Sequence, residues 1–329
     1  MKVAIVGAGA WGTTLALLFA ENKYPVTIWA KEEEVALSIN ESRENKLFLP
    51  GFQLPALIEA SPRLTCLKDA DLSIFVVPTQ YLRRVVKEAK GMINRKSLIV
   101  SAGKGIEEGT RCLPAEIISD ELGGAEVAAL SGPNLSKEIA KGLPAAAVVA
   151  AANISTAAAV QKRLISQRFR VYTNDDVVGV QLGGALKNVI AIASGIVDGL
   201  RLGDNAKAAM LVRGLAEITR LGVAMGGRRE TFAGLSGMGD LITTCSSQMS
   251  RNHQVGQSLA EGKNIKEILA GKKEVAEGVA TSASALALAR EFRVELPITE
   301  QVYNVIHQGK KPYDAIAELM NRDAASEIS

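Results

Sequence analysis

The stretch Val3–Gly12, VAIVGAGAWG, decides the fold. Its first four residues, Val3–Val6, form an apolar run bounded by glycine, which is typical of a strand buried in a parallel sheet. The glycines that follow have Gly-x-Gly-x-x-Gly spacing: Gly7 permits a tight turn, Gly9 admits a phosphate close to the backbone, and Gly12 lets a helix pack on the sheet. A helix that begins here offers free N–H groups and its positive dipole end to an anion. Strand, turn and helix in this order predict a site for the pyrophosphate of a dinucleotide.

Strands and helices continue to alternate through the first half of the chain. Further apolar runs that predict buried strands occur at residues 26–29, 73–77, 97–102, 127–130, 146–150 and 169–172. This alternation predicts a mostly parallel, doubly wound α/β sheet of the Rossmann type. Residues 45–57 contain Pro50, Gly51 and Pro55 and predict an ordered loop.

From about residue 176 the pattern becomes helical. Helical periodicity occurs at residues 179–200, 206–221, 254–261, 264–270, 281–292, 298–307 and 313–321. We therefore expect two domains: a dinucleotide-binding Rossmann domain over residues 1–180 and an all-α substrate and catalytic domain over residues 181–329.

Composition excludes several classes of function. The net charge of +3 and the lack of a basic run interleaved with aromatic residues argue against nucleic-acid binding. The three cysteines lack Cys-x-x-Cys spacing and the chain has two histidines, so no metal site is expected. The alanine-rich run Ala145–Ala152 is too short to span a bilayer. Reduced thiols and no membrane span predict a cytoplasmic protein.

The end of the second predicted strand bears on the choice between NAD and NADP. An acidic residue there would bind the ribose 2′-hydroxyl, whereas a basic residue would receive a 2′-phosphate. The sequence reads Trp29-Ala30-Lys31-Glu32, so the usual acid is missing and Lys31 and Glu32 lie close by. Either cofactor remains possible, and Lys31 favours NADP or dual use.

Lys187 is the strongest candidate for an acid–base residue. It interrupts an otherwise apolar helical segment, and its helical neighbours Gly183, Gly184 and Ala191 are small. Burial and a second cation nearby would lower its pKa, as a proton acceptor requires near neutrality. The alternative is a lysine whose charged end reaches solvent from the edge of a core helix. Neither His253 nor His307 has a carboxylate close in sequence, so histidine is not the expected base.

Three further polar segments suit an anionic substrate. Lys104 follows a strand end, where open α/β sheets bind ligands, although a solvated loop lysine is an equal alternative. Asp240 stands in the glycine-rich sequence GMGDL, predicted to be a turn, where it could bind substrate hydroxyls, pair with a catalytic lysine or cap a helix. The triplet Ser250-Arg251-Asn252 precedes a helical stretch and suits a phosphate, with a plain helix cap as the alternative.

Taken together, these motifs resemble the bacterial-type NAD(P)-dependent glycerol-3-phosphate dehydrogenases along nearly the whole chain. The most specific is GALKNVIAIASG at Gly184–Gly195, which is similar to the family's signature around its catalytic lysine. The other motifs occur in the family's order: GAGAWG at 7–12, KLFLPG at 46–51, SAGKGIE at 101–107, SGPN at 131–134, GLSGMGDL at 234–241 and SRN at 250–252.

The resemblance implies a role for each matched residue. Lys187 would be the proton acceptor in the oxidation of sn-glycerol 3-phosphate to dihydroxyacetone phosphate. The residues expected to contact this small phosphorylated substrate are Lys104, Asn134, Asp240, Ser250, Arg251 and Asn252. Those expected to contact NAD or NADP are Gly7, Gly9, Ala10, Trp11, Gly12, Lys31, Lys104, Gly132, Ser136, Arg251, Val275 and Glu277. The helical domain would be like that of 6-phosphogluconate dehydrogenase, the assembly a homodimer, and the role a supply of glycerol phosphate for phospholipid synthesis.

Three other functions remain open. A ketopantoate reductase or a β-hydroxyacid dehydrogenase would share the two-domain plan but act on a carboxylate without phosphate. A nucleotide-sugar dehydrogenase would need a reactive thiolate, for which Cys245 is the candidate, although a buried structural cysteine fits it better. A non-catalytic dinucleotide sensor would not need Lys187, Asp240 and the SRN triplet together. This sequence also differs from the family pattern at two places. It has Ala30-Lys31 where a glycine and then Arg or His is usual, and it has Asn134 where Thr or Ser is common.

Overall fold

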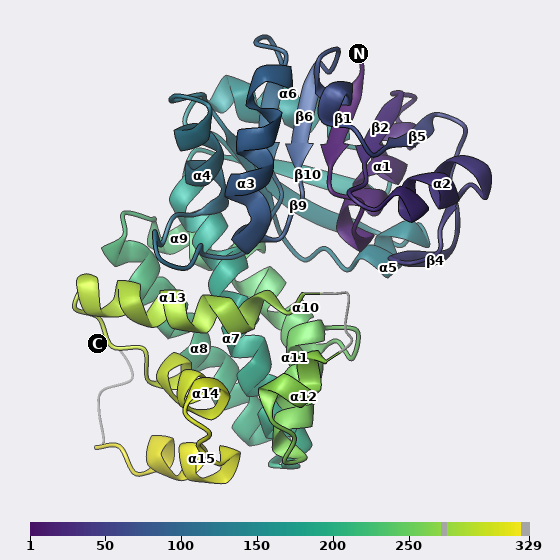
Figure 1. Cartoon of the computed structure of the whole chain (residues 1–329). Coiled ribbons are helices and arrows are strands. Elements are labelled where there is room, and N and C mark those ends of the chain that lie inside the picture. Colours follow the sequence, from purple (N-terminus) through teal and green to yellow (C-terminus); the bar gives the residue numbers. More distant parts are fainter. Residues whose placement is uncertain (271–274, 324–329) are drawn as a thin grey trace.

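The computed structural model describes residues 1–270 and 275–323, which form an upper part built on a sheet and a lower part built from helices (Figure 1). The sheet consists of strands β1 (Val3–Val6), β2 (Val26–Trp29), β5 (Ile58–Ser61), β6 (Leu72–Phe75), β7 (Leu98–Ser101), β8 (Ala128–Ser131), β9 (Ala145–Ala150) and β10 (Phe169–Asn174). Their order across the sheet is β10-β9-β8-β7-β6-β1-β2-β5. Among the described residues, β8 and β9 are the one antiparallel pair in it, so the expected mostly parallel sheet is confirmed.

Helices cover both faces of the sheet, as a doubly wound fold requires. They are α1 (Ala10–Glu21), α2 (Glu33–Glu41), α3 (Thr79–Ala89), α4 (Pro114–Glu121), α5 (Ser136–Ala140) and α6 (Ile154–Leu164), with 3₁₀ turns η1 (Leu64–Leu67) and η2 (Lys90–Met92). The apolar sides of α1, α2 and α6 pack on one face, and those of α3 and α4 pack on the other.

Residues 45–57 are not the single loop that the sequence predicts. They contain most of a short antiparallel pair, β3 (Glu44–Asn45) and β4 (Leu49–Gln53), and β5 follows directly. The buried Asn45 amide donates hydrogen bonds to the Ala8 carbonyl and to Thr13 Oγ1, so this pair is tied to the glycine turn. The strands are too short, and too interrupted by proline and glycine, to give an alternating pattern.

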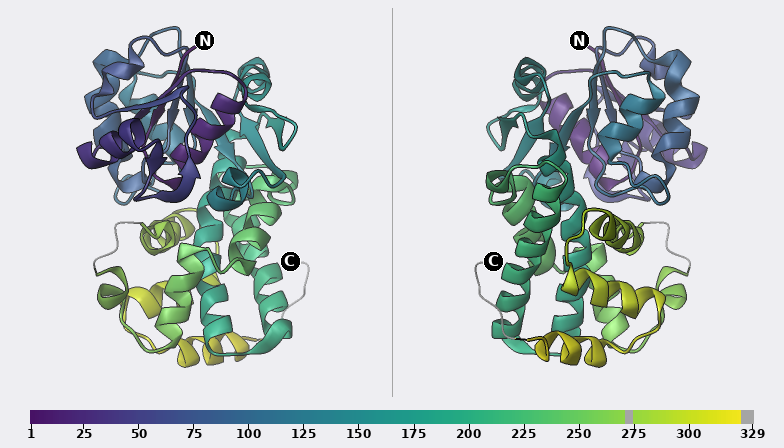
Figure 2. Two further views of the ribbon diagram at one scale, coloured as in Figure 1. Left: turned by 90° about the vertical axis from the view of Figure 1, so that its right-hand side faces the viewer. Right: turned by 90° about the vertical axis from the view of Figure 1, so that its left-hand side faces the viewer.

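The helical part is arranged around α7 (Val177–Gly199), which runs down from the sheet (Figure 2). The other elements are α8 (Gly203–Ala224), α9 (Arg229–Phe232), the π-helical turn η3 (Leu235–Gly239), α10 (Asp240–Ser246), α11 (Arg251–Ala260), α12 (Ile265–Leu269), α13 (Glu277–Glu291), α14 (Pro297–His307) and α15 (Pro312–Met320). Among the described helices, α7 alone is long and apolar enough to cross a membrane. Its apolar residues are buried inside the helical part instead, which explains why it lacks a polar face.

Candidate active site

The glycine turn at the end of β1 leaves a free approach to the N-terminus of α1. A Cβ added to Gly7 would lie 2.7 Å from the Val76 carbonyl oxygen, and one added to Gly12 would lie 2.0 Å from the Gly7 oxygen. These two glycines therefore allow close packing. A Cβ added to Gly9 meets no described atom within 4 Å, and no described side chain caps α1. An anion can reach the free N–H groups of the helix at this point.

Several buried polar atoms of the predicted site residues have no hydrogen-bond partner among the described residues. They include Nε1 of Trp11, both side-chain polar atoms of Asn134, and Oε2 of Glu277. Buried polar groups are normally satisfied, so an unpaired group in a native structure indicates a missing partner. Donors and acceptors of this kind, together with the open side of Gly9, fit a nicotinamide dinucleotide lying across the ends of the strands.

The buried residues Asp240 and Lys187 form one cluster with the partly buried Lys104 where the sheet meets the helices. Lys104 Nζ lies 2.6 Å from Asp240 Oδ2 and 2.9 Å from the Gly132 carbonyl oxygen. Lys187 Nζ lies 2.9 Å from Asp240 Oδ1 and donates to Thr244 Oγ1 at 2.6 Å. One carboxylate is thus shared by two ammonium groups, each from a different part of the chain.

The surroundings of the cluster set its protonation. Burial lowers the pKa of Lys187 to about 8; the charge of Lys104 acts in the same direction, and Asp240 opposes it. Burial works to raise the pKa of Asp240, but the two lysines hold it below its usual range. Asp240 therefore stays ionised while Lys187 can exchange a proton near neutral pH.

The glycines near Lys187 allow other parts of the chain to pack closely against α7. A Cβ on Gly183 would lie 2.7 Å from the Ser236 oxygen of η3, and one on Gly184 would lie 2.5 Å from Ser131 Oγ. The close approach of η3 to α7 brings Asp240, the first residue of α10, beside Lys187. Asp240 thus begins a helix directly after a π-helical turn, and the prediction that it stands in a turn is wrong. Such turns are frequent at functional sites.

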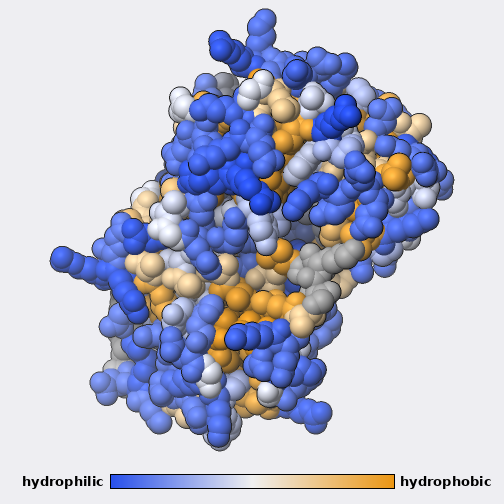
Figure 3. Space-filling view, in the orientation of Figure 1, coloured by the Kyte–Doolittle hydropathy of each residue, from blue (hydrophilic) through white to orange (hydrophobic). Residues whose placement is uncertain are grey.

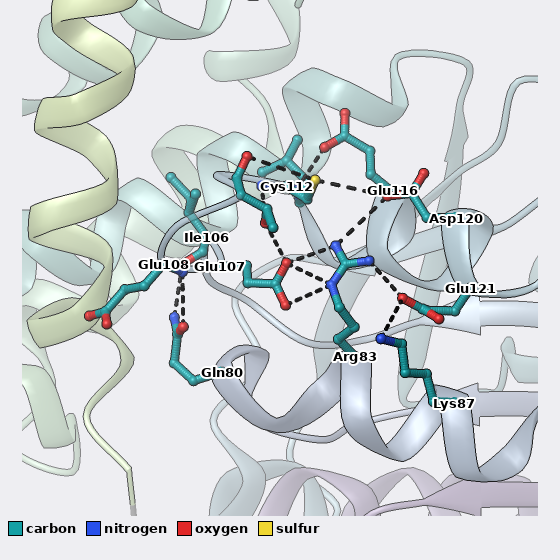
Figure 4. Close-up of polar contacts among 12 residues, drawn as sticks. Gln80, Arg83, Lys87, Ile106, Glu107, Glu108, Cys112, Glu116, Asp120 and Glu121 are labelled. Atoms are coloured by element: carbon teal, nitrogen blue, oxygen red, sulfur yellow. Dashed lines mark hydrogen bonds and ion pairs between the residues drawn. The ribbon is translucent and has the colours of Figure 1, made fainter.

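The loop that carries Lys104 is anchored on both sides. Ile106 and Leu113 are buried in the core of the helical part, and the Ile106 oxygen accepts from Ser284 of α13. On the other side, Arg83 of α3 donates to both carboxylate oxygens of Glu107 at 2.8–3.0 Å (Figure 4). The same guanidinium donates to Glu121 of α4 at 2.8 Å, and Gln80 donates to the Ile106 oxygen. These contacts fix the loop from which Lys104 extends.

The triplet Ser250-Arg251-Asn252 opens α11, as expected. Ser250 caps the helix by accepting from the His253 N–H at 3.2 Å. Asn252 is buried and bridges two helices, because its amide donates to Asn188 Oδ1 and its oxygen accepts from the Gly278 N–H. Arg251 is exposed and free of hydrogen bonds to the described residues, so it is the member best placed to meet an anion. Asn252 has one amide hydrogen left for a ligand.

Glu277 connects the helical part to the sheet. Its Oε1 accepts from the Thr79 N–H at 3.0 Å, at the start of α3. Burial raises the pKa of Glu277 to about 7, while the Thr79 N–H and the charge of Arg251 lower it. Val275 lies just before it, half-buried, at the edge of the described residues.

The remaining predicted residues lie around the same edge of the sheet. Gly132 has a φ of +132°, and its carbonyl oxygen holds Lys104. Ser136 begins α5 and its carbonyl oxygen accepts from Thr14, whereas Ala10 begins α1. Lys31 is exposed just beyond β2. Three residues of the site were not predicted from the sequence: Thr79, Asn188 and Thr244. The only sequence signals for two of them are their positions, because Asn188 directly follows Lys187 and Thr244 lies four residues after Asp240.

Two other expectations concern metals and thiols. Within residues 1–270 and 275–323 no group of histidine, cysteine, aspartate and glutamate side chains could hold a metal ion. Cys66, Cys112 and Cys245 are free thiols. Cys245 is buried near Lys187, and burial raises its pKa to about 12, which removes it as a reactive thiolate.

A glycine turn that faces an uncapped helix, with a buried lysine of lowered pKa across the domain junction, defines the class of nicotinamide-dependent dehydrogenases. Residues 2–157 match the model of the NAD-dependent glycerol-3-phosphate dehydrogenase N-terminus, and residues 176–317 match that of the C-terminus. The chain belongs to the NAD-dependent glycerol-3-phosphate dehydrogenase family.

Individual relatives agree with this assignment. The glycerol-3-phosphate dehydrogenase [NAD(P)+] of Citrifermentans bemidjiense is 46% identical over 330 residues, covering 99% of this chain and 98% of the relative. A crystal structure of glycerol-3-phosphate dehydrogenase from Coxiella burnetii has a TM-score of 0.94 and 39% identity, covering 98% of this chain and 99% of that one. A ketopantoate reductase from Ralstonia eutropha is 17% identical with a TM-score of 0.63, covering 96% of this chain and all of that one, and shares the fold alone.

Proposed function

We propose that this chain interconverts sn-glycerol 3-phosphate and dihydroxyacetone phosphate by hydride transfer with NAD(H) or NADP(H), and so supplies glycerol phosphate for phospholipid synthesis. One observation carries the proposal: Lys187 and Lys104 share the carboxylate of Asp240, and this cluster lies next to the start of α11. When bound, the nicotinamide dinucleotide supplies or accepts the hydride. The fit of such a group rests on the open side of Gly9 and the unpaired atoms of Trp11, Asn134 and Glu277.

In this mechanism Lys187 moves the proton at the C2 oxygen of the substrate. With a pKa of about 8 the amine is mostly protonated at neutral pH, so it is ready to donate a proton to the carbonyl oxygen of dihydroxyacetone phosphate. In the oxidative direction the neutral amine takes the hydroxyl proton. Asp240 keeps Lys187 in place and Lys104 orients the carbonyl end. Arg251, with Ser250 and Asn252, holds the phosphate, because a guanidinium can grip two phosphate oxygens.

Lys31 sets the preference between the two cofactors in our proposal. It is exposed beyond β2, and no carboxylate stands at the strand tip to bind a ribose 2′-hydroxyl. The test is steady-state reduction of dihydroxyacetone phosphate followed at the nicotinamide absorbance band with NADH and with NADPH. We expect turnover with both, and Lys31→Glu is expected to lower kcat/KM for NADPH about tenfold and leave NADH within about twofold. Equal effects on both cofactors would show that Lys31 does not meet the 2′-phosphate.

The same assay separates the rival functions. A ketopantoate reductase or β-hydroxyacid dehydrogenase would turn over carboxylate-bearing keto acids and ignore dihydroxyacetone phosphate. A non-catalytic dinucleotide sensor would bind cofactor and turn over neither. Rapid turnover of dihydroxyacetone phosphate, competitively inhibited by inorganic phosphate, is the expected result, and no turnover with either cofactor would contradict the proposal.

We also propose a cytoplasmic homodimer whose dinucleotide-binding domain spans residues 1–180 and whose helical domain spans residues 181–329. Free thiols at all three cysteines support a reducing compartment. Large apolar side chains are exposed on the helical half at Val212, Tyr313 and Met320, and Figure 3 shows apolar residues gathered on that half. Such surface is typical of subunit contacts. Light scattering after gel filtration is expected to give twice the chain mass of 34.8 kDa, and a single-chain mass would contradict the dimer.

A further inference from the structure

The start of α11 is held against α7 by backbone contact. Below the triplet Ser250–Asn252 the two helices touch through glycines: a Cβ on Gly195 would lie 2.0 Å from the His253 carbonyl oxygen, and one on Gly256 would lie 2.0 Å from the Ile192 oxygen. Such contact allows a close approach but has little directionality, so it does not by itself fix where α11 stands along α7.

A directional bond lies at this crossing. His253 Nε2 is 2.7 Å from Oδ2 of Asp198 near the end of α7, and Lys207 Nζ of α8 is 2.7 Å from the same oxygen. The His253 side chain is fully buried. Its Nδ1 has no hydrogen-bond partner among the described residues. An apolar side chain would avoid the cost of burying that nitrogen, so the bond from Nε2 to Asp198 is what an imidazole adds at this position.

Asp198 lies on the helix that carries the acid–base lysine. It follows Lys187 by 198 − 187 = 11 residues, which is about three turns of α7 and returns to the same face. A second bond, from the Asn252 amide to Asn188 Oδ1, ties α11 to α7 beside Lys187. The start of α11 is therefore bonded to α7 at Asn188 and at Asp198, which lie before and after the glycine contact along α7.

We infer that His253 is a positioning residue for the phosphate of the substrate: through Asp198 it fixes the start of α11, and thus Arg251, at a set distance from Lys187. The inference rests on the proposed role of Arg251 in holding the phosphate. His253 touches neither substrate nor cofactor and takes no part in proton transfer. Loss of its bond lets the start of α11 move relative to α7, which weakens binding of the phosphate and leaves the chemistry at C2 in place.

The test uses two substrates, one without a phosphate. In His253→Leu we expect KM for dihydroxyacetone phosphate and the inhibition constant of inorganic phosphate to rise about tenfold, the equivalent of one hydrogen bond to a charged group. The kcat at saturation, and kcat/KM for dihydroxyacetone, are expected to stay within about twofold. His253→Gln restores a donor toward Asp198 and should recover most of the affinity. His307→Gln changes the chain's other histidine, which ends α14 and bonds to Ser282 of α13 rather than to Asp198. It is the matched control and should alter none of these values.

Each outcome distinguishes this inference from the proposed function. If Arg251→Ala leaves KM for dihydroxyacetone phosphate and phosphate inhibition unchanged, the proposed phosphate site at the start of α11 fails. If Arg251→Ala raises KM for dihydroxyacetone phosphate and the inhibition constant of phosphate, but His253→Leu raises neither value, the positioning role alone is overturned. If His253→Leu lowers kcat for both substrates, the positioning role is also overturned, because such a fall would indicate that the substitution disturbs α7 as a whole. Should His253→Leu not fold, Asp198→Ala removes the other end of the bond and carries the same expectations.

Discussion

At the scale of single residues, the balance of effects on Lys187 decides what the site can do. Burial alone disfavours the ammonium form, and its ion pair with Asp240 recovers only part of that cost. The second cation, Lys104, is held by the same carboxylate, so Asp240 cannot neutralise both lysines. Lowering the pKa from 10.5 to about 8 corresponds to roughly 3 kcal/mol in favour of the neutral amine. An isolated ion pair would have had the opposite effect.

The pH dependence of the reaction follows from this pKa. We expect kcat/KM for oxidation of glycerol 3-phosphate to rise with pH and level off above about 8, because the neutral form of Lys187 accepts the proton. In the reductive direction kcat/KM should fall as pH rises through the same value. The apparent pKa belongs to the cluster of Lys104, Asp240 and Lys187 together. Profiles of kcat/KM against pH at fixed ionic strength measure this apparent pKa. If kcat/KM changes with pH in the same direction for both reactions, the assignment of proton transfer to Lys187 is contradicted.

Sequence alone predicts most residues of the proposed site but not their partners in space. Local sequence predicts a functional role for each of Lys187, Lys104 and Asp240, but it also leaves a purely structural role open for each of them. Their contact joins segments 53 to 136 residues apart, where 240 − 187 = 53 and 240 − 104 = 136, and such distances leave no local pattern. His253 was judged to lack a carboxylate because none is near in sequence, yet Asp198 lies 2.7 Å away in space.

At the scale of elements, the loop after β7 connects the two parts of the molecule. It carries Lys104 at one end, places Ile106 and Leu113 in the helical core, and is held from the sheet side by Arg83. The loop is therefore fixed between the two parts, and Arg83 acts on Lys104 only through Glu107.

Arg83→Met is expected to release this loop. Glu107 would keep its hydrogen bond from Thr110 but lose its ion-pair partner at a buried position, which should cost roughly 1–3 kcal/mol in the free energy of unfolding. With Lys104 displaced, kcat/KM should fall about tenfold, and the apparent pKa of the reaction should rise because a cation beside Lys187 is withdrawn. Arg84→Met is the matched control, since Arg84 is exposed and paired only loosely with Glu88. An unchanged pH profile in Arg83→Met would show that the loop keeps Lys104 in place without Arg83.

A second element-scale device caps α14. Glu217 of α8 is buried and accepts hydrogen bonds from the N–H groups of Ile298 and Thr299 and from the Thr299 hydroxyl. Burial raises its pKa to about 7, and these bonds act in the opposite direction. A carboxyl group with a raised pKa contributes stability that is fully present below its unfolded pKa and is lost as pH rises through the folded value.

Glu217→Gln is expected to remove that pH dependence. Between pH 5 and 8 the free energy of unfolding of the unmodified chain should fall, relative to the variant, by about 2–3 kcal/mol. Urea unfolding at a series of pH values measures the difference. Parallel curves for the two proteins would mean that the carboxylate is already ionised at pH 5, stabilised by its three hydrogen bonds.

The elements show where sequence patterns succeed and where they fail. The strands of the main sheet other than β5, and the long helices, are predicted within a few residues, because each has a continuous apolar run or a clear helical period. Sequence patterns miss the pair β3–β4, the edge strand β5 and the π-helical turn η3, since each has at most five residues and lacks a continuous apolar run. The small size of Gly183 and Gly184 is visible in the sequence, but only the structure shows that they admit the backbone of η3 and the side chains of Ser131 and Lys104.

At the scale of the whole molecule, the proposed active site lies where the two parts meet. The sheet part supplies the glycine turn, Lys104 and Gly132, and the helical part supplies Lys187, Asp240 and the start of α11. Glu277 adds a direct contact to Thr79 across the junction. Neither part holds both an anion site for a dinucleotide and a residue for proton transfer, which is why the fold class alone did not define the function.

The central claim is that Lys187 transfers the proton during reduction of dihydroxyacetone phosphate. The most direct test is kcat of Lys187→Ala with saturating NADPH, measured without and with added ethylamine. We expect cofactor binding to be retained, kcat to fall by about three orders of magnitude, and the rate to rise in proportion to the concentration of ethylammonium, which replaces the missing acid. Near-normal turnover of Lys187→Ala, or a loss that no added amine restores while the folded structure is intact, would contradict the claim.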